Sequence, residues 1–220
     1  DVSSFIEHEQ DRGMQPNTVS TRLQLVYAFL RYLVDREVAH PDLLKRKFKV
    51  KVPEALPRAI EREDIQQVLA VIEKPRDRAM ILVLLRTGMR IGELLATRMS
   101  EVNLREKQII LMEAQKTGVG RVAYLSEDAC KALVVWLNQR DPAKERLFYG
   151  QGRPQLSYTA IRVRFAKYLE KAGLAHKGYS LHCLRHTCAT ELLNAGMRLE
   201  CLQQLLGHSS IEMTRRYARL

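Results

Sequence analysis

The sequence lacks the features that mark membrane proteins, disulfide-rich proteins and metal sites. It has no apolar run of about 18 residues, the length of a membrane span, and no signal-peptide pattern at its start. Its cysteines form no CxxC pair, and no histidine spacing completes a zinc site. We therefore expect a cytoplasmic protein with no metal and no cofactor, whose reduced, mostly packed cysteines are Cys130, Cys183, Cys188 and Cys201.

Internal repeats and low-complexity segments are also absent, but the charge is far from balanced. The 220 residues include 36 Lys+Arg against 25 Asp+Glu, a formal net charge of +11. The isoelectric point is about 9.7. Such a charge favours a polyanionic partner, and nucleic acid is the first candidate. Many basic proteins bind no nucleic acid, so charge alone leaves both readings open.

Two prolines divide the chain. Pro53 and Pro57 bracket a segment without a regular hydrophobic period, which is typical of a linker. We therefore predict a small helical domain over residues 1–52, a linker over 53–59 and a larger domain over 60–220.

The first domain is predicted to be helical throughout most of its length. Residues 1–12 have the pattern of a helix end, and residues 19–37 follow the helical three-and-four spacing after a start at Pro16. A basic stretch, KRKFKVK, occupies residues 45–51. Because the chain begins with Asp1 rather than methionine, we expect this domain to be N-terminally incomplete or processed.

The larger domain is predicted to be mainly α with a small antiparallel β element. Residues 107–114 contain a run of β-forming side chains, the glycines of KTGVG (116–120) indicate a turn, and residues 121–125 supply a return strand. Helices are expected over 60–72, 76–85, 91–96, 127–139, 157–172, 187–195 and 199–206. Ser209 and Glu212 form a capping-box pattern that would start a last helix.

The most informative pattern lies near the end of the chain. His182 and Arg185 are three positions apart, so they share one face of a helix. His208 follows in an LGH turn, and Tyr217 comes nine positions later, on the predicted last helix. Two histidines, an arginine and a late tyrosine suit attack by a phenolate on a DNA phosphodiester.

That reaction places strict demands on side chains. A protein nucleophile stores the phosphoester energy in a covalent link. A phenol has a pKa of about 10 and needs help to lose its proton. The pentacoordinate phosphate carries extra negative charge, which fixed cations must stabilise. Arginine suits this task because its planar fork donates two hydrogen bonds to neighbouring phosphate oxygens.

Longer stretches resemble one family. The segment HCLRHTCATELLNAG followed by LQQLLGHSS, together with the earlier TGMRIGELL, is similar to the tyrosine recombinases, also called the phage integrase family. The matching positions cover residues 87–217. The resemblance implies a mainly α catalytic domain with a small antiparallel β element. It also implies a preceding helical core-binding domain that clamps DNA from the opposite side.

The resemblance also assigns roles at the phosphate. Arg90 and Arg185 would be its two clamping arginines, and Glu93 would support Arg90 from one helical turn further on. His208 would donate a hydrogen bond to the scissile phosphate. Taken singly, each pattern has an ordinary explanation: RxxE as a surface ion pair, HxxR as a surface pair near a helix start, and a histidine after glycine as a helix cap.

The resemblance assigns a second set of residues to nucleophilic attack and proton transfer. Tyr217 would attack the phosphate, Lys116 would donate a proton to the departing 5′-oxygen, and His182 would assist proton transfer. Lys116 lies in the predicted hairpin, where an ordinary solvated turn lysine is the simple alternative and Lys107 is close by. We expect His186 to be structural.

As a partner, the resemblance implies double-stranded DNA, cleaved through a 3′-phosphotyrosyl link with no need for metal or ATP. It implies a homo-tetramer on DNA that is a monomer when free, accessory DNA-bending proteins, no membrane and a nucleoid-associated place in the cytoplasm. Integration, transposition, cassette capture and dimer resolution share one kind of site, so the sequence does not separate them.

Three alternatives stay open. A type IB topoisomerase shares the chemistry but relaxes supercoils as a monomer, without strand exchange. A DNA-binding protein of the same fold that does not cut is disfavoured because all six catalytic positions of the family are filled, namely by Arg90, Lys116, His182, Arg185, His208 and Tyr217. An unrelated helical protein with coincidental motifs is the last.

Overall fold

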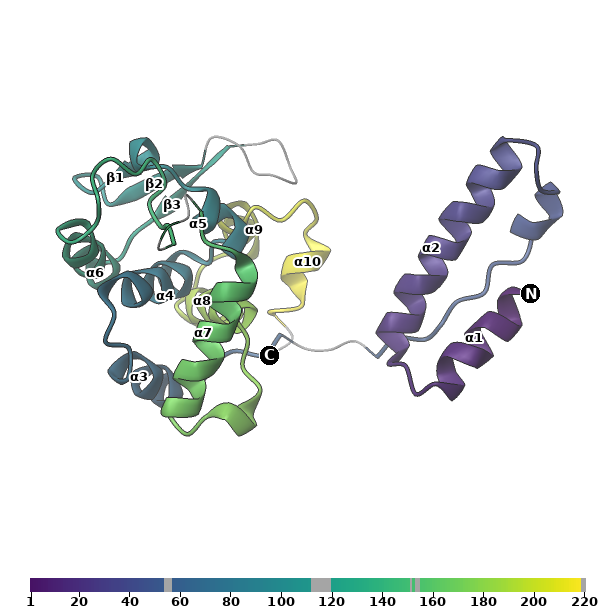
Figure 1. Ribbon diagram of the computed structural model, residues 1–220, viewed down its shortest axis with the longest axis horizontal. Helices are drawn as coiled ribbons and strands as arrows, with labels where there is room; N and C mark the ends of the chain where they lie inside the picture. The colour runs from purple at the N-terminus through teal and green to yellow at the C-terminus, as the bar shows by residue number, and fades with distance from the viewer. Residues whose placement is uncertain (54–56, 112–119, 151, 153–154, 219–220) are drawn as a thin grey trace. The chain divides into compact units, whose positions relative to one another are not determined.

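A computed structural model describes residues 1–53, 57–111, 120–150, 152 and 155–218. The chain divides into two compact units, Asp1–Ala55 and Leu56–Leu220 (Figure 1). Lys116 and the turn predicted around it lie outside the described residues. No helix in the described part of the chain is long and apolar enough to cross a bilayer.

The first unit consists of two α-helices and one 3₁₀ turn, namely α1 (Val2–Asp11), α2 (Pro16–Asp35) and η1 (Pro41–Leu44). Its core is small: Val19 and Leu23 are its buried apolar side chains among the described residues. The buried carboxylate of Glu9 on α1 pairs with Arg12 at 3.2 Å and with Arg22 on α2. The ion pair between Glu9 and Arg22 therefore helps to join α1 to α2, alongside the small apolar core.

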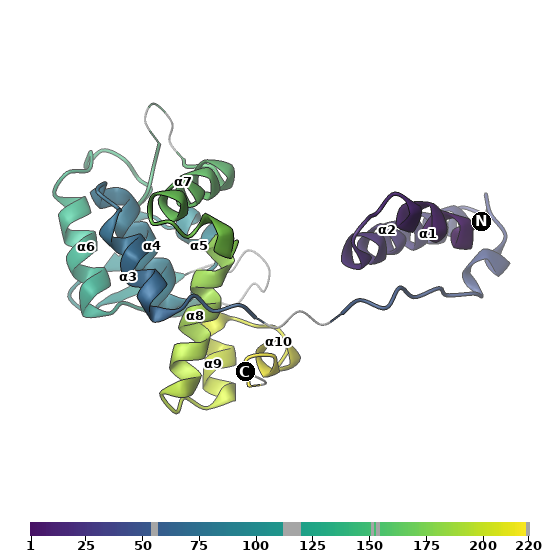
Figure 2. The same ribbon diagram turned by 90° about the horizontal axis from the view of Figure 1, so that it is seen from below.

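The second unit is a group of helices with a three-stranded antiparallel sheet at one edge (Figure 1), and Figure 2 shows its helices from below. The strands β1 (Val102–Asn103), β2 (Gln108–Leu111) and β3 (Arg121–Tyr124) lie in the order β1-β2-β3, with Ile109 opposite Ala123. Its α-helices are α3 (Arg62–Ala70), α4 (Pro75–Thr87), α5 (Ile91–Ala96), α6 (Glu127–Leu137), α7 (Tyr158–Lys171), α8 (Leu181–Asn194), α9 (Leu199–Leu206) and α10 (Glu212–Arg215). Two 3₁₀ turns, η2 (Met99–Glu101) and η3 (Ala175–Lys177), complete it. The expected mainly α fold with a small antiparallel sheet is confirmed.

Helix α4 is the centre of this unit. Every side chain from Ala79 to Leu85 is buried, and a helix that is apolar on all sides belongs in an interior. It packs against α6 and α8. Gly88 ends it in the left-handed conformation with φ of +62°, and an added Cβ there would lie 2.7 Å from Leu206. This close turn brings Arg90 toward the end of α9.

Two predicted helix starts are wrong. Helix α8 begins at Leu181 rather than at Thr187, since its first turn carries polar side chains that hide the hydrophobic period. The last helix begins at Glu212, but Ser209 does not cap it; the Oγ of Ser210 instead accepts from the Glu212 N–H at 3.2 Å. As a result, Tyr217 lies in the turn after α10 rather than on the helix.

The four cysteines are free thiols, and three of them are packed. Cys130, Cys183 and Cys188 are buried, whereas Cys201 is exposed on α9.

Candidate active site

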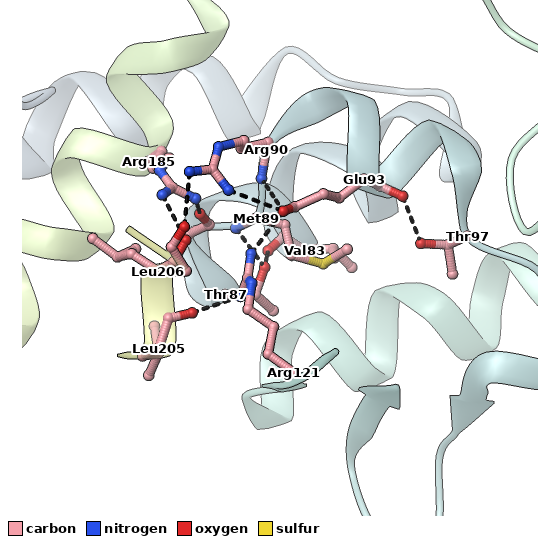
Figure 3. Close-up of polar contacts among 12 residues, drawn as sticks. Val83, Thr87, Met89, Arg90, Glu93, Thr97, Arg121, Arg185, Leu205 and Leu206 are labelled. Carbon is pink, nitrogen blue, oxygen red and sulfur yellow. Dashed lines mark hydrogen bonds and ion pairs between the residues drawn. The ribbon is translucent and has the colours of Figure 1, made fainter. Parts of the chain in front are cut away.

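Three arginines from three different elements meet at the carboxyl end of α9 (Figure 3). Arg121, the first residue of β3, donates to the carbonyl oxygen of Leu205 at 2.5 Å. Arg185 on α8 donates to that of Leu206 at 2.7 Å, and Arg90 before α5 donates to that of Gly207 at 2.9 Å. We call these three side chains together with Glu93 the arginine cluster.

The local sequence explains why α9 can receive them. Gly207 ends the helix with φ of +63°, and the last turn of a helix leaves carbonyl groups without partners inside it. Those carbonyls also form the negative end of the helix dipole, which favours cations. Arg185 takes a further carbonyl at the end of α4, that of Gly88, at 2.5 Å. The guanidinium group of Arg185 therefore bridges the ends of α4 and α9.

Glu93 holds two of the three arginines in register. Its carboxylate pairs with Arg90 at 3.2 Å and with Arg121 at 2.6 Å, and it accepts from the backbone N–H of Arg90 at 2.7 Å. The carboxylate is buried. Three guanidinium charges against one carboxylate leave a local excess of positive charge, which suits a phosphate.

The buried Arg185 remains a cation at neutral pH. Removal from water lowers its pKa to about 10, with Arg90 and Arg121 adding repulsion and Glu93 opposing it. A guanidinium that keeps its charge inside the protein interacts strongly with an anion, because the surrounding dielectric is low.

Tyr217 lies beside this cluster, in the segment that follows α9. Its ring is buried against Ala189, Leu202 and Leu206. Its hydroxyl lies 2.8 Å from Nδ1 of His186. Burial raises the pKa of Tyr217, while the charges of Arg185 and Arg216 oppose that rise. The phenol is therefore protonated in this state.

His208 is fixed by a threonine. Its Nδ1 lies 2.8 Å from Oγ1 of Thr214, a residue with no exposed surface. The ring is parallel to that of Tyr217, with centroids 6.3 Å apart. Burial and the neighbouring Arg185 lower the pKa of His208 to about 4, so the ring is neutral and its Nε2 is left for another partner.

The structure thus brings together most of the residues predicted from the sequence. Arg90, Glu93 and Arg185 meet in the arginine cluster, and His208 and Tyr217 stack beside it. His182 is exposed and contacts His186 edge-on, with ring centroids 4.5 Å apart. Lys116 is outside the described residues, so its role stays a prediction.

Three side chains of the site were not predicted for these positions. Arg121 completes the arginine cluster, Thr214 orients His208, and His186, expected to be structural, contacts the hydroxyl of Tyr217. A basic residue at the start of the predicted return strand was a weak signal for Arg121. The direct succession of Arg185 by a second histidine was the signal for His186; nothing in the local sequence marks Thr214.

Comparison with known proteins agrees with this geometry. The sequence model described as the phage integrase family matches residues 58–220. The chain is 30% identical over 234 aligned residues to tyrosine recombinase XerC of Roseiflexus castenholzii, covering 100% of this chain and 73% of that protein. It is also 30% identical to tyrosine recombinase XerA of Thermococcus onnurineus, covering 93% of this chain and 70% of the relative.

Solved structures share the fold. The integrase of transposon Tn1549, in complex with circular intermediate DNA, aligns with a TM-score of 0.81 at 20% identity, covering 99% of this chain and 80% of the other. The recombinase XerH, bound to its palindromic difH substrate, aligns with a TM-score of 0.80 at 21% identity, covering 100% and 69%. From the family match and the identity to XerC together, it follows that this chain belongs to the phage integrase family of tyrosine recombinases.

Proposed function

We propose that this chain is a site-specific DNA recombinase that cleaves and rejoins double-stranded DNA through a 3′-phosphotyrosyl intermediate. The observation that carries the proposal is the position of a buried tyrosine hydroxyl beside an arginine cluster with excess positive charge. The solved relatives of the same fold that are bound to DNA make DNA the polyanion of choice.

In the proposed reaction, Tyr217 attacks the scissile phosphate and the 5′-oxygen departs. Arg90 and Arg185 hold the non-bridging oxygens through two-pronged hydrogen bonds, and Nε2 of His208 donates to one of them. Glu93 keeps Arg90 oriented. Because fixed guanidinium groups supply the positive charge, we expect cleavage without added metal or ATP.

Protons move at two places. The tyrosine hydroxyl loses one as it attacks, and the departing 5′-oxygen gains one. Lys116 is proposed as the donor to the 5′-oxygen, with His182 assisting from its exposed position on α8. The 5′-hydroxyl of a second strand then reverses the reaction and releases Tyr217.

We further propose that four copies assemble on DNA while the free chain is a monomer, with the first unit acting as the core-binding domain and DNA-bending proteins as accessories. The first unit supports this role through a basic segment held against its long helix. The Tyr27 hydroxyl donates to the Arg46 carbonyl at 3.0 Å and accepts from the Phe48 N–H at 2.7 Å. Phosphate contacts from the lysines of this basic segment, residues 45–51, predict DNA binding that weakens steeply as the salt concentration rises.

Covalent capture tests the chemistry. The protein is incubated with nicked duplexes made from DNA flanking its own gene, without metal or ATP, and adducts that survive SDS are resolved by gel electrophoresis. We expect an adduct with the natural chain and none with Tyr217→Phe. An adduct that persists in Tyr217→Phe would show that another residue is the nucleophile.

Strand transfer separates the recombinase from the alternatives. Addition of a second duplex with a free 5′-hydroxyl should yield a recombinant strand joined across the two duplexes. Relaxation of supercoiled plasmid without such joining would indicate a type IB topoisomerase. Salt-sensitive binding with no adduct at any site would indicate a DNA-binding protein that does not cut.

A further inference from the structure

We propose that His186 is the general base of the cleavage step, accepting the phenolic proton of Tyr217 at Nδ1 as the tyrosine oxygen bonds to phosphorus. This inference rests on the proposed function and deepens it by giving a role to a residue outside the six positions taken from the family resemblance.

The contact itself is short enough for direct proton transfer. Nδ1 of His186 lies 2.8 Å from the Tyr217 hydroxyl oxygen, within the range in which a base can take a proton directly. His182, by contrast, meets the His186 ring edge-on at 4.5 Å between centroids and has no hydrogen bond to Tyr217 among those described. The geometry favours His186 over His182 for this step.

The neighbouring charges indicate which way the hydrogen bond runs. The cations that act on the buried tyrosine are Arg185 and Arg216, and a guanidinium group can only donate hydrogen bonds. The phenolic hydrogen therefore needs an acceptor, and His186 supplies one at Nδ1 when its own ring proton is on Nε2. In this arrangement Tyr217 donates and His186 accepts.

The sequence places the base and a phosphate clamp on one helix. His186 directly follows Arg185 on α8, so the arginine points to the ends of α4 and α9 while the histidine faces the tyrosine. Position and orientation of both groups are set by the same buried helix. A phosphate bound by Arg185 is therefore delivered next to the hydroxyl that His186 activates.

Before DNA binds, this base is weak. The pKa of His186 is lowered to about 4, mainly by burial. His182, Arg216 and Arg185 add to this lowering, because they repel the positive charge that His186 would gain on protonation. The pKa of Tyr217 is raised above its ordinary value. Proton transfer is strongly disfavoured in the free chain, so the nucleophile stays neutral.

A bound phosphodiester changes that balance. Its negative charge beside Arg185 offsets part of the repulsion that adds to burial in lowering the pKa of His186, so that pKa rises when the substrate arrives. The base is thus strengthened by the substrate that it is needed for. The charged and titratable groups that face it are His182 and Arg185 from α8, and Arg216 and Tyr217 from the segment after α10.

The step balances in atoms and charge. The O–H bond of Tyr217 breaks and an N–H bond forms at Nδ1 of His186. The tyrosine oxygen bonds to phosphorus as the bond from phosphorus to the 5′-oxygen breaks, and that oxygen takes a proton from the acid proposed as Lys116. On religation, His186 returns its proton to the departing phenol.

The decisive variant is His186→Asn. The Oδ1 of asparagine can occupy the place of Nδ1 and accept the same hydrogen bond, but it cannot accept a proton at neutral pH. Tyr217 should stay docked while the base is lost. We expect single-turnover adduct formation to fall by about a hundredfold or more, the usual contribution of a general base. The pH–rate profile should change from a plateau to a continuous rise with pH.

A modified substrate separates the base from the acid. When the 5′-bridging oxygen is replaced by sulfur, the leaving group departs as a thiolate and needs no proton. We expect this substrate to restore cleavage by Lys116→Ala but not by His186→Asn. Unfolding of both variants, followed by the fluorescence of Trp136, controls for misfolding, since the single tryptophan is packed in the second unit.

Three outcomes are distinct. A slow His186→Asn chain that the sulfur substrate does not rescue supports the base. Cleavage by His186→Asn within about threefold of the natural rate, with an unchanged pH–rate profile, would overturn it, because general bases contribute far more. Absence of any Tyr217-dependent adduct with the natural chain would overturn the proposed function itself, and this inference with it.

Discussion

The two halves of the candidate site are built very differently. The arginine cluster stands on α8, β3 and the turn between α4 and α5, which all belong to the main core of the second unit. The tyrosine segment, residues 208–218, contains only the four-residue helix α10 and packs through a separate small cluster with α8 and α9. The proposed anion-binding half is therefore part of the main core, whereas the proposed nucleophile, Tyr217, is attached through a small separate cluster.

This difference suggests that the arginine cluster contributes mainly to stability, whereas the tyrosine segment contributes mainly to the proposed reaction. Placing three guanidinium groups close together costs free energy unless buried partners offset their charge. Glu93 and the carbonyl groups at the end of α9 are these partners. The neutral Tyr217 needs no such counter-charge, and it packs through the small apolar cluster with α8 and α9. Variants in the two halves should accordingly differ in their effect on unfolding.

The largest effect is expected for Glu93→Ala. Removal of this buried carboxylate leaves Arg121 and Arg90 close together without their shared counter-charge. The free energy of unfolding should fall by about 3 to 5 kcal/mol, as for other broken buried pairs. Urea unfolding followed by Trp136 fluorescence measures it. The matched control is Glu127→Ala, which removes an exposed pair with Lys107; equal losses in the two variants would refute the arginine cluster as a core element.

Gly207→Ala tests the joint between the halves. An alanine there would hold φ of +63° and place its Cβ 2.9 Å from Nε of Arg121. Gly173→Ala is the control, because it shares a positive φ of +73° but meets no atom within 4 Å. Both should lose about 1 kcal/mol from backbone strain. Gly207→Ala should lose at least about 1 kcal/mol more from crowding, and equal unfolding midpoints would show that Arg121 moves aside freely.

Acid should loosen the tyrosine segment before the arginine cluster. The pKa values of His186 and His208 are about 4 in the folded chain, below the ordinary value of about 6.5 for an unfolded histidine. The unfolded chain therefore binds more protons between these values, and stability present above about pH 6.5 is lost as pH falls toward 4. We expect a loss of about 1 kcal/mol per imidazole between about pH 7 and about pH 5.5.

Urea unfolding at several pH values measures this loss. The double variant His186→Asn, His208→Asn should lower the slope of stability against pH in that range. A slope equal to that of the natural chain would mean that other groups bind the protons.

Thr214→Val should have the smallest of these effects. Valine fills the same space but cannot hydrogen-bond His208, so the free energy of unfolding should fall by about 1 kcal/mol. Thr190→Val is the control, since the buried Oγ1 of Thr190 has no hydrogen-bond partner among the described residues and its loss should cost nothing. Equal midpoints in urea would indicate that Thr214 does not fix His208; a Thr214→Ser variant should restore the bond.

Much of the fold could be predicted because its elements follow local rules. The apolar run of α4 and the three-and-four spacing of α2 placed both helices to within a few residues. The first turn of α8 escaped detection because His182, Arg185 and His186 interrupt its period. These side chains lie where they do for the site, so local pattern and function conflict there.

The site was predictable only as far as motif positions reach. Arg90, Arg185 and His208 were assigned from the resemblance of their motifs to the family, but their partners are set by tertiary contacts. Arg121 meets Leu205 across 84 positions of sequence, and His186 meets Tyr217 across 31. A lone threonine such as Thr214 carries no signal until the turn after His208 is folded.

The end of α9 has a consequence for how a substrate enters. Its three successive peptide oxygens, from Leu205 to Gly207, each accept a hydrogen bond from one of Arg121, Arg185 and Arg90. A phosphate that arrives at Arg90 or Arg185 therefore meets guanidinium groups that protein oxygens have already oriented, and it uses N–H donors that these bonds leave over. Side-chain freedom worth about 2 kcal/mol per arginine has been surrendered beforehand. The peptide groups that orient these arginines are the ones from which the chain runs on to Tyr217, so the proposed phosphate site and the proposed nucleophile depend on the same short stretch of backbone.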